Sequence, residues 1–188
     1  MNQPAEPIAD IEKFEGAGLY VFYYVGDFPV YEALSARNSA GSFHEPIYVG
    51  KAIPKGGRKG GSLDLDPGAV LYQRITQHRR SLEEATNLDV ADFYCRRLVV
   101  DDIWISLGET LLIAKFKPLW NSIIDGFGNH DPGKGRHRGM KSRWDVLHPG
   151  RSWAERLKPR EETADALIEE VKDFLRQHPP AGKNPFEE

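Results

Sequence analysis

The order of the hydrophobic segments constrains the fold more than any other feature of the sequence. Three short runs rich in aromatic and β-branched residues favour strands, and these are residues 18–25, 46–51 and 93–100. Longer stretches with helical periodicity are residues 70–80, 101–116 and 161–178. The order strand, strand, helix, strand, helix, helix predicts an α+β fold with a small, mostly antiparallel sheet of about three strands flanked by helices.

Other local patterns are shorter. Residues 28–34 are compatible with a further strand or edge, and residues 35–45 with a loop. Residues 81–84 match a Ser-x-x-Glu capping box, which favours a new helix or turn there. Residues 125–151 are rich in glycine and histidine and indicate irregular structure. In the segment 101–116, one helical face is shared by Ile103, Leu107, Leu111 and Ala114.

Length and composition exclude several classes of protein. The chain has 188 residues, 40% hydrophobic and 28% charged, which suits one domain with a sizeable core. Its apolar runs are far too short to span a bilayer, and its first residues lack the basic start and apolar segment of a secretory signal. Cys95 is the single cysteine, so no internal disulfide can form. We therefore expect a cytoplasmic protein without a membrane partner.

Charge is segregated along the chain, although the net charge is only −3. Residues 51–80 carry a local charge of +5 and residues 133–160 one of +7, so the other 130 residues together carry −15. Two basic patches on an acidic body suit a polyanion such as nucleic acid. Two solvated basic loops would give the same pattern, so charge alone does not decide.

Two tripeptides stand in predicted strands, Gly18-Leu19-Tyr20 and Tyr48-Val49-Gly50. If these strands are neighbours, Tyr20 and Tyr48 lie close together on one face of the sheet. A tyrosine in a strand most often belongs simply to the core, so this pattern needs support from elsewhere.

Polar side chains in the helical segments give that support. Arg74 and His78 are four residues apart and therefore project from the same side of a helix. Glu109 lies in an otherwise apolar helix, where an unpaired carboxylate is costly, and Asn121 follows that helix. Simpler explanations are a basic helix surface, a salt bridge from Glu109 to Lys115 or an arginine, and a helix cap at Asn121.

Two other patterns point to chemistry less specifically. His130, His137 and His148, together with Cys95, lack the short ligand spacing of a zinc site. The glycine-rich residues 56–61 lack the Gly-Lys-Ser/Thr ending of a nucleotide-binding loop, which argues against nucleotide hydrolysis.

In their order along the chain, these positions resemble the GIY-YIG nuclease superfamily. The pattern is Gly-Leu-Tyr, Tyr-Val-Gly-Lys, Arg-x-x-x-His on a helix, a glutamate within a helix, and an asparagine. It covers about residues 16–122, with Leu19 and Val49 where the name of the superfamily has isoleucine. The two tyrosines are 28 residues apart, more than in the usual hairpin, so residues 26–46 are interpreted as an insertion. This spacing, together with Arg-x-x-x-His, resembles the restriction-endonuclease branch.

The resemblance implies an endodeoxyribonuclease that depends on Mg²⁺, with Mn²⁺ as an alternative ion. The implied catalytic residues are Tyr20, Tyr48, Lys51, Arg74, His78, Glu109 and Asn121. Glu109 would hold the metal ion, Arg74 would bind phosphate oxygens, and Tyr48 would position water or phosphate. Asn121 would orient the catalytic face.

Tyr20 would accept a proton from the attacking water or align that water. An ordinary tyrosine has a pKa of about 10, so Tyr20 needs a neighbour that lowers its pKa or relays its proton. Lys51 and His78 are both candidates, and the sequence does not choose between them.

Double-stranded DNA is the implied substrate, read by loops on the catalytic core. The expected DNA-contacting residues are Lys55, Arg58, Lys59, Arg136, Arg138, Lys141 and Arg143. Arginine suits guanine, which favours a GC-rich palindrome, and cleavage of both strands of a palindrome favours a homodimer. The alternatives are a structure-specific repair or junction nuclease of the same superfamily and a DNA-binding module without catalysis.

The implied domain organisation is a single domain with two additions. Residues 1–12 are expected to be a flexible tail. Residues 13–124 would form the catalytic core, with insertions at 26–46 and 51–68. Residues 125–188 would add a basic DNA-contacting segment and a C-terminal helix to the same domain.

Overall fold

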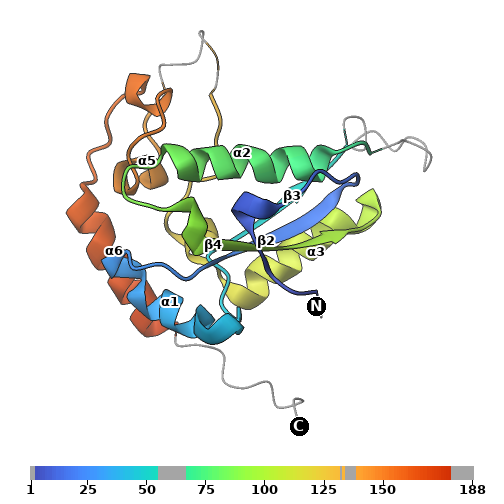
Figure 1. Cartoon of the computed structure of the whole chain (residues 1–188). Coiled ribbons are helices and arrows are strands. Elements are labelled where there is room, and N and C mark those ends of the chain that lie inside the picture. The colour runs from blue at the N-terminus through green and yellow to red at the C-terminus, as the bar shows by residue number, and fades with distance from the viewer. Residues whose placement is uncertain (1–2, 55–66, 132, 134–138, 179–188) are drawn as a thin grey trace.

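A computed structural model describes residues 3–54, 67–131, 133 and 139–178 of the chain (Figure 1). Four strands form one antiparallel sheet in the order β1-β4-β2-β3. Their bounds are Glu6–Pro7 for β1, Gly18–Tyr24 for β2, Tyr48–Ala52 for β3 and Phe93–Val99 for β4. The predicted fold class is confirmed, and the short β1 is added to the three expected strands.

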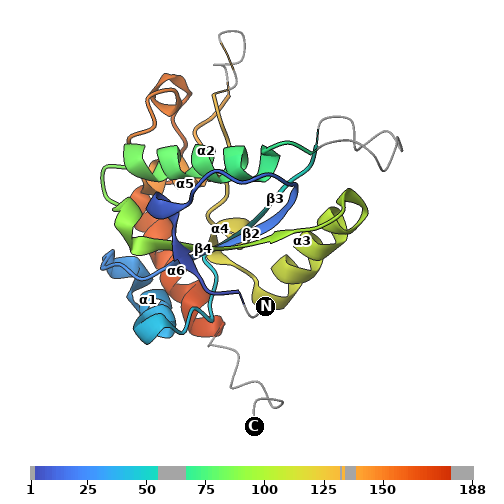
Figure 2. The same cartoon turned by 45° about the vertical axis from the view of Figure 1, so that its right-hand side comes forward.

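Six α-helices surround the sheet in the described part of the chain. They are α1 (Glu32–Asn38), α2 (Val70–Glu84), α3 (Asp102–Phe116), α4 (Leu119–Ser122), α5 (Arg143–Leu147) and α6 (Ala164–Gln177). Helices α2 and α3 lie on opposite sides of the sheet (Figures 1 and 2). Among the described residues, no helix has the length and apolar character needed to cross a membrane.

Strand β2 is the centre of the sheet. All seven of its residues are buried, because β3 and β4 pair with its two edges and helices cover its two faces. Leu19 and Val21 point to the side of α3, where they join clusters with Ile105 and Leu112. Tyr20 points to the side of α2 and joins the main core. Neighbouring residues of β2 therefore pack on opposite faces of the sheet, as the two-residue period of a strand requires.

Helix α2 is longer than the sequence pattern suggested. Its buried residues Leu71, Ile75, His78 and Leu82 recur every three or four positions along one side. The expected new helix or turn at 81–84 is wrong, because Leu82 continues this buried stripe and α2 runs unbroken to Glu84.

The insertion at 26–46 is helical, so the strand expected at 28–34 is wrong and the loop expected at 35–45 is partly so. Pro29 begins a 3₁₀ turn, which leads directly into α1. Proline suits the first turn of a helix, and Tyr31 and Leu34 repeat at helical rather than strand spacing.

A chain of buried hydrogen bonds fixes the insertion to the rest of the domain. The Trp120 indole donates to the Tyr31 oxygen over 2.9 Å, and the Tyr31 hydroxyl donates to Nε2 of His148 over 2.6 Å. Burial lowers the pKa of His148 to about 3, so the imidazole is neutral and can accept this bond. Nδ1 of His148 donates to the Asn87 side-chain oxygen over 3.0 Å.

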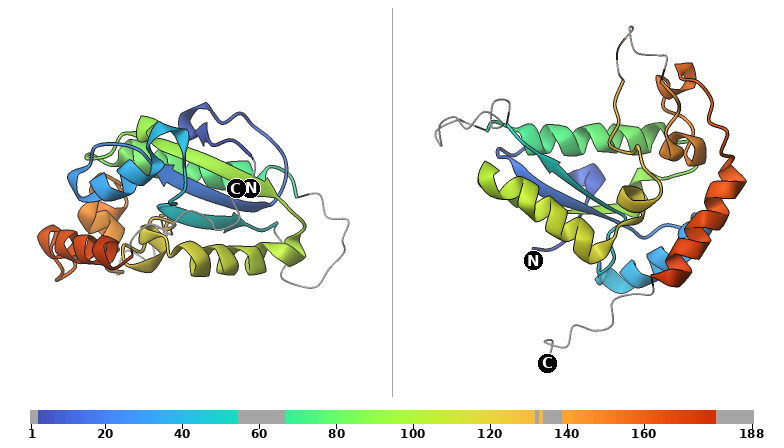
Figure 3. Two further views of the ribbon diagram at one scale, coloured as in Figure 1. Left: turned by 90° about the horizontal axis from the view of Figure 1, so that it is seen from below. Right: turned by 180° about the vertical axis from the view of Figure 1, so that it is seen from behind.

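The C-terminal segment is also more regular than expected. Helix α5 lies within the predicted irregular segment 125–151, and the Ser142 side chain caps it by accepting from the Asp145 amide. Helix α6 confirms the predicted closing helix and lies beside α1 (Figures 1 and 3). Arg37 of α1 donates to the His178 carbonyl over 3.2 Å, which ties these two helices together.

The N-terminal residues are part of the core. The flexible tail predicted for residues 1–12 is wrong for residues 6–11, because β1 pairs with β4 and a 3₁₀ turn follows at Ile8–Asp10. Ile8 and Ile11 are only 1% and 5% exposed. The two prolines of this segment suggested a loose tail, but its two isoleucines anchor it.

Replacing Ile8 with alanine should therefore destabilise the whole domain. The loss of a buried isoleucine typically costs about 2–5 kcal/mol. Urea unfolding of Ile8→Ala, followed by circular dichroism, measures this effect, and Glu12→Ala at an exposed position is the control. A loss below about 0.5 kcal/mol, the range of ordinary surface changes, would show that the N-terminus is not anchored.

Candidate active site

Tyr20 and Tyr48 lie on the same face of the sheet, as predicted. The register of β2 and β3 pairs Tyr20 with Gly50 and Phe22 with Tyr48, so the tyrosines are diagonal neighbours with ring centroids 6.2 Å apart. A Cβ atom at Gly50 would lie 2.3 Å from the Tyr20 hydroxyl. The glycine of Tyr-Val-Gly therefore leaves the space in which the Tyr20 ring crosses β3.

Tyr20 forms a buried hydrogen bond with His78 of α2. The hydroxyl donates to Nε2 over 2.6 Å, and both residues are almost completely buried. Burial lowers the pKa of His78 well below its usual value, and the charge of Arg74 adds to this effect, so the imidazole is neutral. Of the two candidates for the partner of Tyr20, the structure selects His78.

The pKa of Tyr20 itself is raised well above 10. Burial is the main cause, followed by the nearby Tyr48, while the charge of Arg74 lowers it. Two roles were expected of a neighbour, lowering the pKa of Tyr20 or relaying its proton; Arg74 lowers this pKa, but desolvation outweighs its effect. A protonated phenol bonded to a neutral imidazole is an arrangement through which a proton can pass.

The Arg74 guanidinium lies near Tyr20, Tyr48 and His78 and is held by hydrogen bonds. One Nη donates to the carbonyl of Gly128 over 2.8 Å, and the other donates to the Gln77 side chain over 3.1 Å. Nδ1 of His130 lies 3.5 Å from the same guanidinium. The fork is fixed in place and half-buried, and a small pocket next to it is lined by His78, His130 and Trp153 among others.

Glu109 and Lys51 form an ion pair on the α3 side of β3. The Lys51 ammonium lies 2.8 Å from a Glu109 carboxylate oxygen and 3.3 Å from the Ser106 hydroxyl. Both side chains remain partly exposed, at 30% and 21%. The salt bridge considered for Glu109 thus exists, with Lys51 as its partner in place of Lys115 or an arginine.

The candidate residues lie on both faces of the edge strand β3. Tyr48 points to the α2 side and Lys51 to the α3 side, because they are three residues apart on one strand. The described contacts include no hydrogen bond or ion pair that joins Glu109 to Tyr20 or Arg74. Tyr48 interacts electrostatically with both Arg74 and Glu109. Burial raises the pKa of Tyr48, the charge of Arg74 lowers it, and the charge of Glu109 raises it.

Asn121 holds this edge of the sheet in place. Its side-chain oxygen accepts from the Val49 amide over 2.8 Å, and its side-chain nitrogen donates to the Val49 carbonyl over 2.9 Å. These two bonds replace the strand that β3 lacks on its outer edge. They fix the residues on either side of Val49, which are Tyr48 and Gly50. The alternative of a helix cap is wrong, because Lys117, in the left-handed conformation, ends α3.

Phe127 is a residue of the site that the sequence analysis did not identify. Its ring stacks on His78 with centroids 4.5 Å apart and meets Tyr48 edge-on at 5.0 Å. It therefore packs over the His78 ring beside the Tyr20–His78 hydrogen bond. A single phenylalanine in a segment rich in glycine carried no periodic signal.

Arg151 fixes the loop that carries Phe127. This arginine is 1% exposed and forms a 2.7 Å ion pair with Asp145. Its two Nη atoms donate to the carbonyls of Gly126, Phe127 and Asn129 over 3.0–3.2 Å. The same loop presents the Gly128 carbonyl to Arg74, so a buried charge pair positions two parts of the site. Trp144 and Trp153 cover the guanidinium of Arg151.

Comparison with known protein families matches residues 12–175 to the Eco29kI GIY-YIG domain, a family associated with restriction endonucleases. The chain belongs to this family. A search of curated proteins found no match to the sequence. The resemblance inferred from the sequence is confirmed, and the chain is a GIY-YIG nuclease domain with DNA as its substrate class.

The predicted DNA-contacting residues of this nuclease have different outcomes. Five lie outside the described residues, namely Lys55, Arg58, Lys59, Arg136 and Arg138. Lys141 is half-buried and pairs with Glu155 over 2.9 Å.

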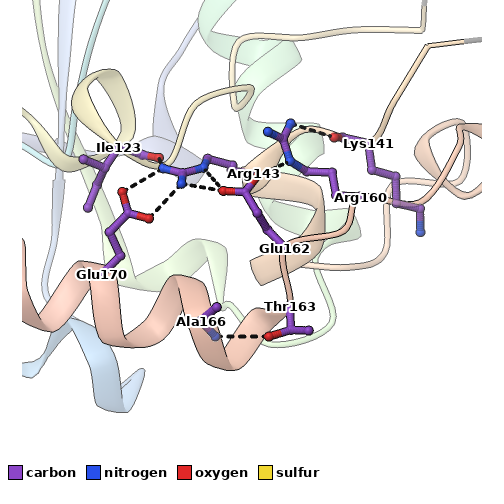
Figure 4. Close-up of polar contacts among 8 residues, drawn as sticks. All are labelled: Ile123, Lys141, Arg143, Arg160, Glu162, Thr163, Ala166 and Glu170. Atoms are coloured by element: carbon purple, nitrogen blue, oxygen red, sulfur yellow. Dashed lines mark hydrogen bonds and ion pairs between the residues drawn. The ribbon is translucent and has the colours of Figure 1, made fainter.

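Arg143 has a structural role in place of the predicted DNA contact. Its guanidinium donates to Glu162, to Glu170 and to the Ile123 carbonyl, over 2.5–3.0 Å (Figure 4). These five bonds use all five N–H donors of an arginine. They join α5 to α6 and leave the fork no donor for a base or a phosphate.

The metal-binding candidates can be tested against the same structure. No cluster of three or more His, Cys, Asp or Glu residues that could hold a metal occurs in the described part of the chain, so no zinc site is found there. A magnesium ion needs less, because it keeps several waters and is usually bound through one or two carboxylates and substrate phosphates. The partly exposed carboxylate of Glu109 fits this requirement.

Substituting Gly128 with alanine should reduce cleavage without unfolding the domain. An added Cβ would lie 2.9 Å from the Tyr48 hydroxyl and 3.3 Å from the Arg74 guanidinium, both of which are ends of flexible side chains. These groups can move, so stability should hold, but their displacement should lower kcat by about tenfold or more.

Single-turnover cleavage and urea unfolding of Gly128→Ala measure the two effects. The exposed position Ser122→Ala serves as the control. Unchanged kcat in a folded Gly128→Ala protein would mean that the positions of Tyr48 and Arg74 do not matter for cleavage.

Proposed function

We propose that this GIY-YIG nuclease is a type II restriction endonuclease that cuts double-stranded DNA at a specific site with one divalent metal ion. The observation that carries the proposal is that Tyr48, which lies beside the Tyr20–His78 pair on the α2 side of β3, interacts electrostatically both with the Arg74 guanidinium and with the Glu109 carboxylate on the α3 side. Phosphodiester hydrolysis needs a proton acceptor for water, positive charge at the phosphate and support for the leaving oxygen.

Tyr20 and His78 provide the proton acceptor. The attacking water would give its proton to the Tyr20 oxygen while the Tyr20 proton passes to Nε2 of His78, 2.6 Å away. Burial disfavours a charged imidazole in the free protein. A bound phosphate brings negative charge to the site and favours the protonated imidazole, so substrate binding would prepare the pair for reaction.

Arg74 and Tyr48 face the phosphate. The Arg74 fork can donate to two phosphate oxygens at once, and its charge is permanent. Tyr48 is half-buried between Arg74 and Glu109, where its hydroxyl can orient the water or a phosphate oxygen. Asn121 would act through Val49 by keeping β3 in register.

Glu109 would hold the metal ion on the other side of the phosphate, with Mg²⁺ expected first and Mn²⁺ as the alternative. When bound, the ion supplies positive charge for the leaving 3′ oxygen. Lys51 lies beside Glu109 and is also bonded to Ser106, so its ammonium adds positive charge on this side of the strand. Two cationic groups on opposite sides of β3 would then hold one phosphate between them.

Specific cleavage further implies a reader and a second active site. We assign the reading of a GC-rich palindrome to basic residues. They are Lys55, Arg58, Lys59, Arg136 and Arg138, and Lys141 would also contact the DNA. A palindrome presents the same scissile bond on each strand, so a homodimer with two-fold symmetry would place one site at each. A cytoplasmic location belongs to the same proposal.

Replacing Glu109 with glutamine should abolish cleavage and spare DNA binding. The change removes the metal-holding charge but leaves Arg74 and the basic residues proposed to read DNA unchanged. Cleavage of a linear plasmid with Mg²⁺ should fall by about 100-fold or more, while the Kd for the same DNA without metal should change by less than about threefold.

The control is Glu169→Gln, an exposed carboxylate of α6 that pairs only with Lys172 among the described residues. This variant should cut and bind like the original protein. Equal losses of cleavage and binding in Glu109→Gln, or full cleavage by it, would contradict the assignment.

A further inference from the structure

The outer face of α3 is apolar and exposed. Ile103, Trp104, Leu107 and Leu111, here called the α3 face, are 64%, 56%, 52% and 59% exposed. They are four of the seven large hydrophobic residues exposed in the described part of the chain. Helix α3 lies at the outer edge of the molecule (Figures 2 and 3), and the exposure of these four side chains means that the described part of the chain does not cover them. Contiguous exposed apolar side chains of this kind mark interaction sites.

The apolar surface continues from the helix onto the sheet. Gly108 of α3 packs directly on Leu19 of β2, so α3 sits close to the sheet there. The register pairs Leu19 with Leu98 of β4, which lies on the same face of the sheet and is 39% exposed. The α3 face therefore has an apolar strand end beside it.

The charge pattern of α3 selects among partners. Between Ile103 and Ala114 the single charged residue is Glu109, which points to Lys51 and away from the α3 face. A surface without cations does not suit DNA, which binds through lysine and arginine. The ends of the helix are charged with opposite signs, with Asp101 and Asp102 before its first turn or in it and Lys115 and Lys117 at its end.

This pattern is complementary to itself. If two α3 helices cross antiparallel with Leu107 of each at the centre, Ile103 of one copy faces Leu111 of the other. At 1.5 Å per residue, Asp101 lies about 9 Å from the centre and Lys115 of the other copy about 12 Å from it in the same direction. The remaining offset of about 3 Å is well within the reach of a lysine side chain, and antiparallel helix dipoles also attract.

We propose that the α3 face is the interface of a homodimer, with two α3 helices antiparallel about a two-fold axis near Leu107. This inference rests on the dimer of the proposed function and names the surface that forms it. The interface is isologous, as two-fold symmetry requires, and Trp104 gives each copy a large aromatic anchor. Glu109 is two residues from Leu107 and thus about 200° around the helix, so pairing leaves both active sites open.

Disulfide trapping tests the geometry. Leu107→Cys places a thiol at the symmetry axis, and the native Cys95 is buried and does not compete. With oxidised glutathione, the two introduced thiols, one from each copy, lose two electrons and two protons to form one disulfide, and the glutathione disulfide is reduced to two glutathione molecules. Most of the protein should become a covalent dimer at low micromolar concentration.

Met140→Cys is the matched control, because Met140 is 56% exposed and lies outside α3. It should remain largely monomeric under the same conditions. Equal trapping of both variants, or none with Leu107→Cys, would overturn the proposal.

Light scattering gives an independent measurement on the full chain. The original protein should have twice the monomer mass of 21.2 kDa, Leu107→Glu should have the monomer mass, and Met140→Glu should remain dimeric. Thermal unfolding checks that each variant is folded. A monomeric original protein at about 50 µM, well above the Kd expected of a stable dimer, or a dimeric Leu107→Glu, would overturn the proposed interface.

Plasmid cleavage by the same samples separates this inference from the proposed function. A dimer that forms through α3 but cuts no DNA would contradict the nuclease proposal and support the interface. A monomer that cuts DNA would overturn the interface and the proposed dimer but support the nuclease activity.

Discussion

Tyr20 and His78 share a buried hydrogen bond of 2.6 Å, and the ring of Phe127 stacks on His78 beside it. This bond joins the central strand of the sheet to α2, so the same contact that holds the two layers together also sets up the candidate proton path. It needs Gly50, since any side chain there would occupy the space of the Tyr20 ring. Burial keeps the phenol protonated and the imidazole neutral, so the phenol is the donor and the imidazole the acceptor of this hydrogen bond in the free protein.

The edge strand β3 then determines how the remaining groups meet. Because neighbouring residues of a strand point to opposite faces, Tyr48 joins the α2 side and Lys51 the α3 side, where it contacts Glu109. Asn121 supplies the hydrogen bonds that the outer edge lacks and so fixes both groups through one strand. The same contacts thus hold the core together and position the site, so a change at Asn121 or Gly50 would affect both stability and the geometry of the site.

Local patterns predicted much of this. The three main strands follow runs of aromatic and β-branched residues, α3 follows a long apolar stretch and α6 follows helical periodicity, and the chemistry of each candidate residue could be argued from its type and spacing. The helical insertion at 26–46 and the anchored N-terminus were missed, because their buried residues, such as Tyr31 and Ile8, become visible only when distant elements cover them. The basic segment misled for a similar reason: Arg143 points to Glu162 and Glu170, which lie outside residues 133–160. Sequence charge shows where cations occur but not which of them are already paired.

Digestion of a plasmid of known mixed sequence, with Mg²⁺ and then with a chelator, tests the central claim most directly. The residues gathered around β3, joined to a reader of specific sequence, predict a fixed set of discrete fragments that requires the metal ion and is the same in every digest. A smear of fragments, cleavage of branched DNA alone, or no cleavage of any DNA by the folded protein would contradict the account.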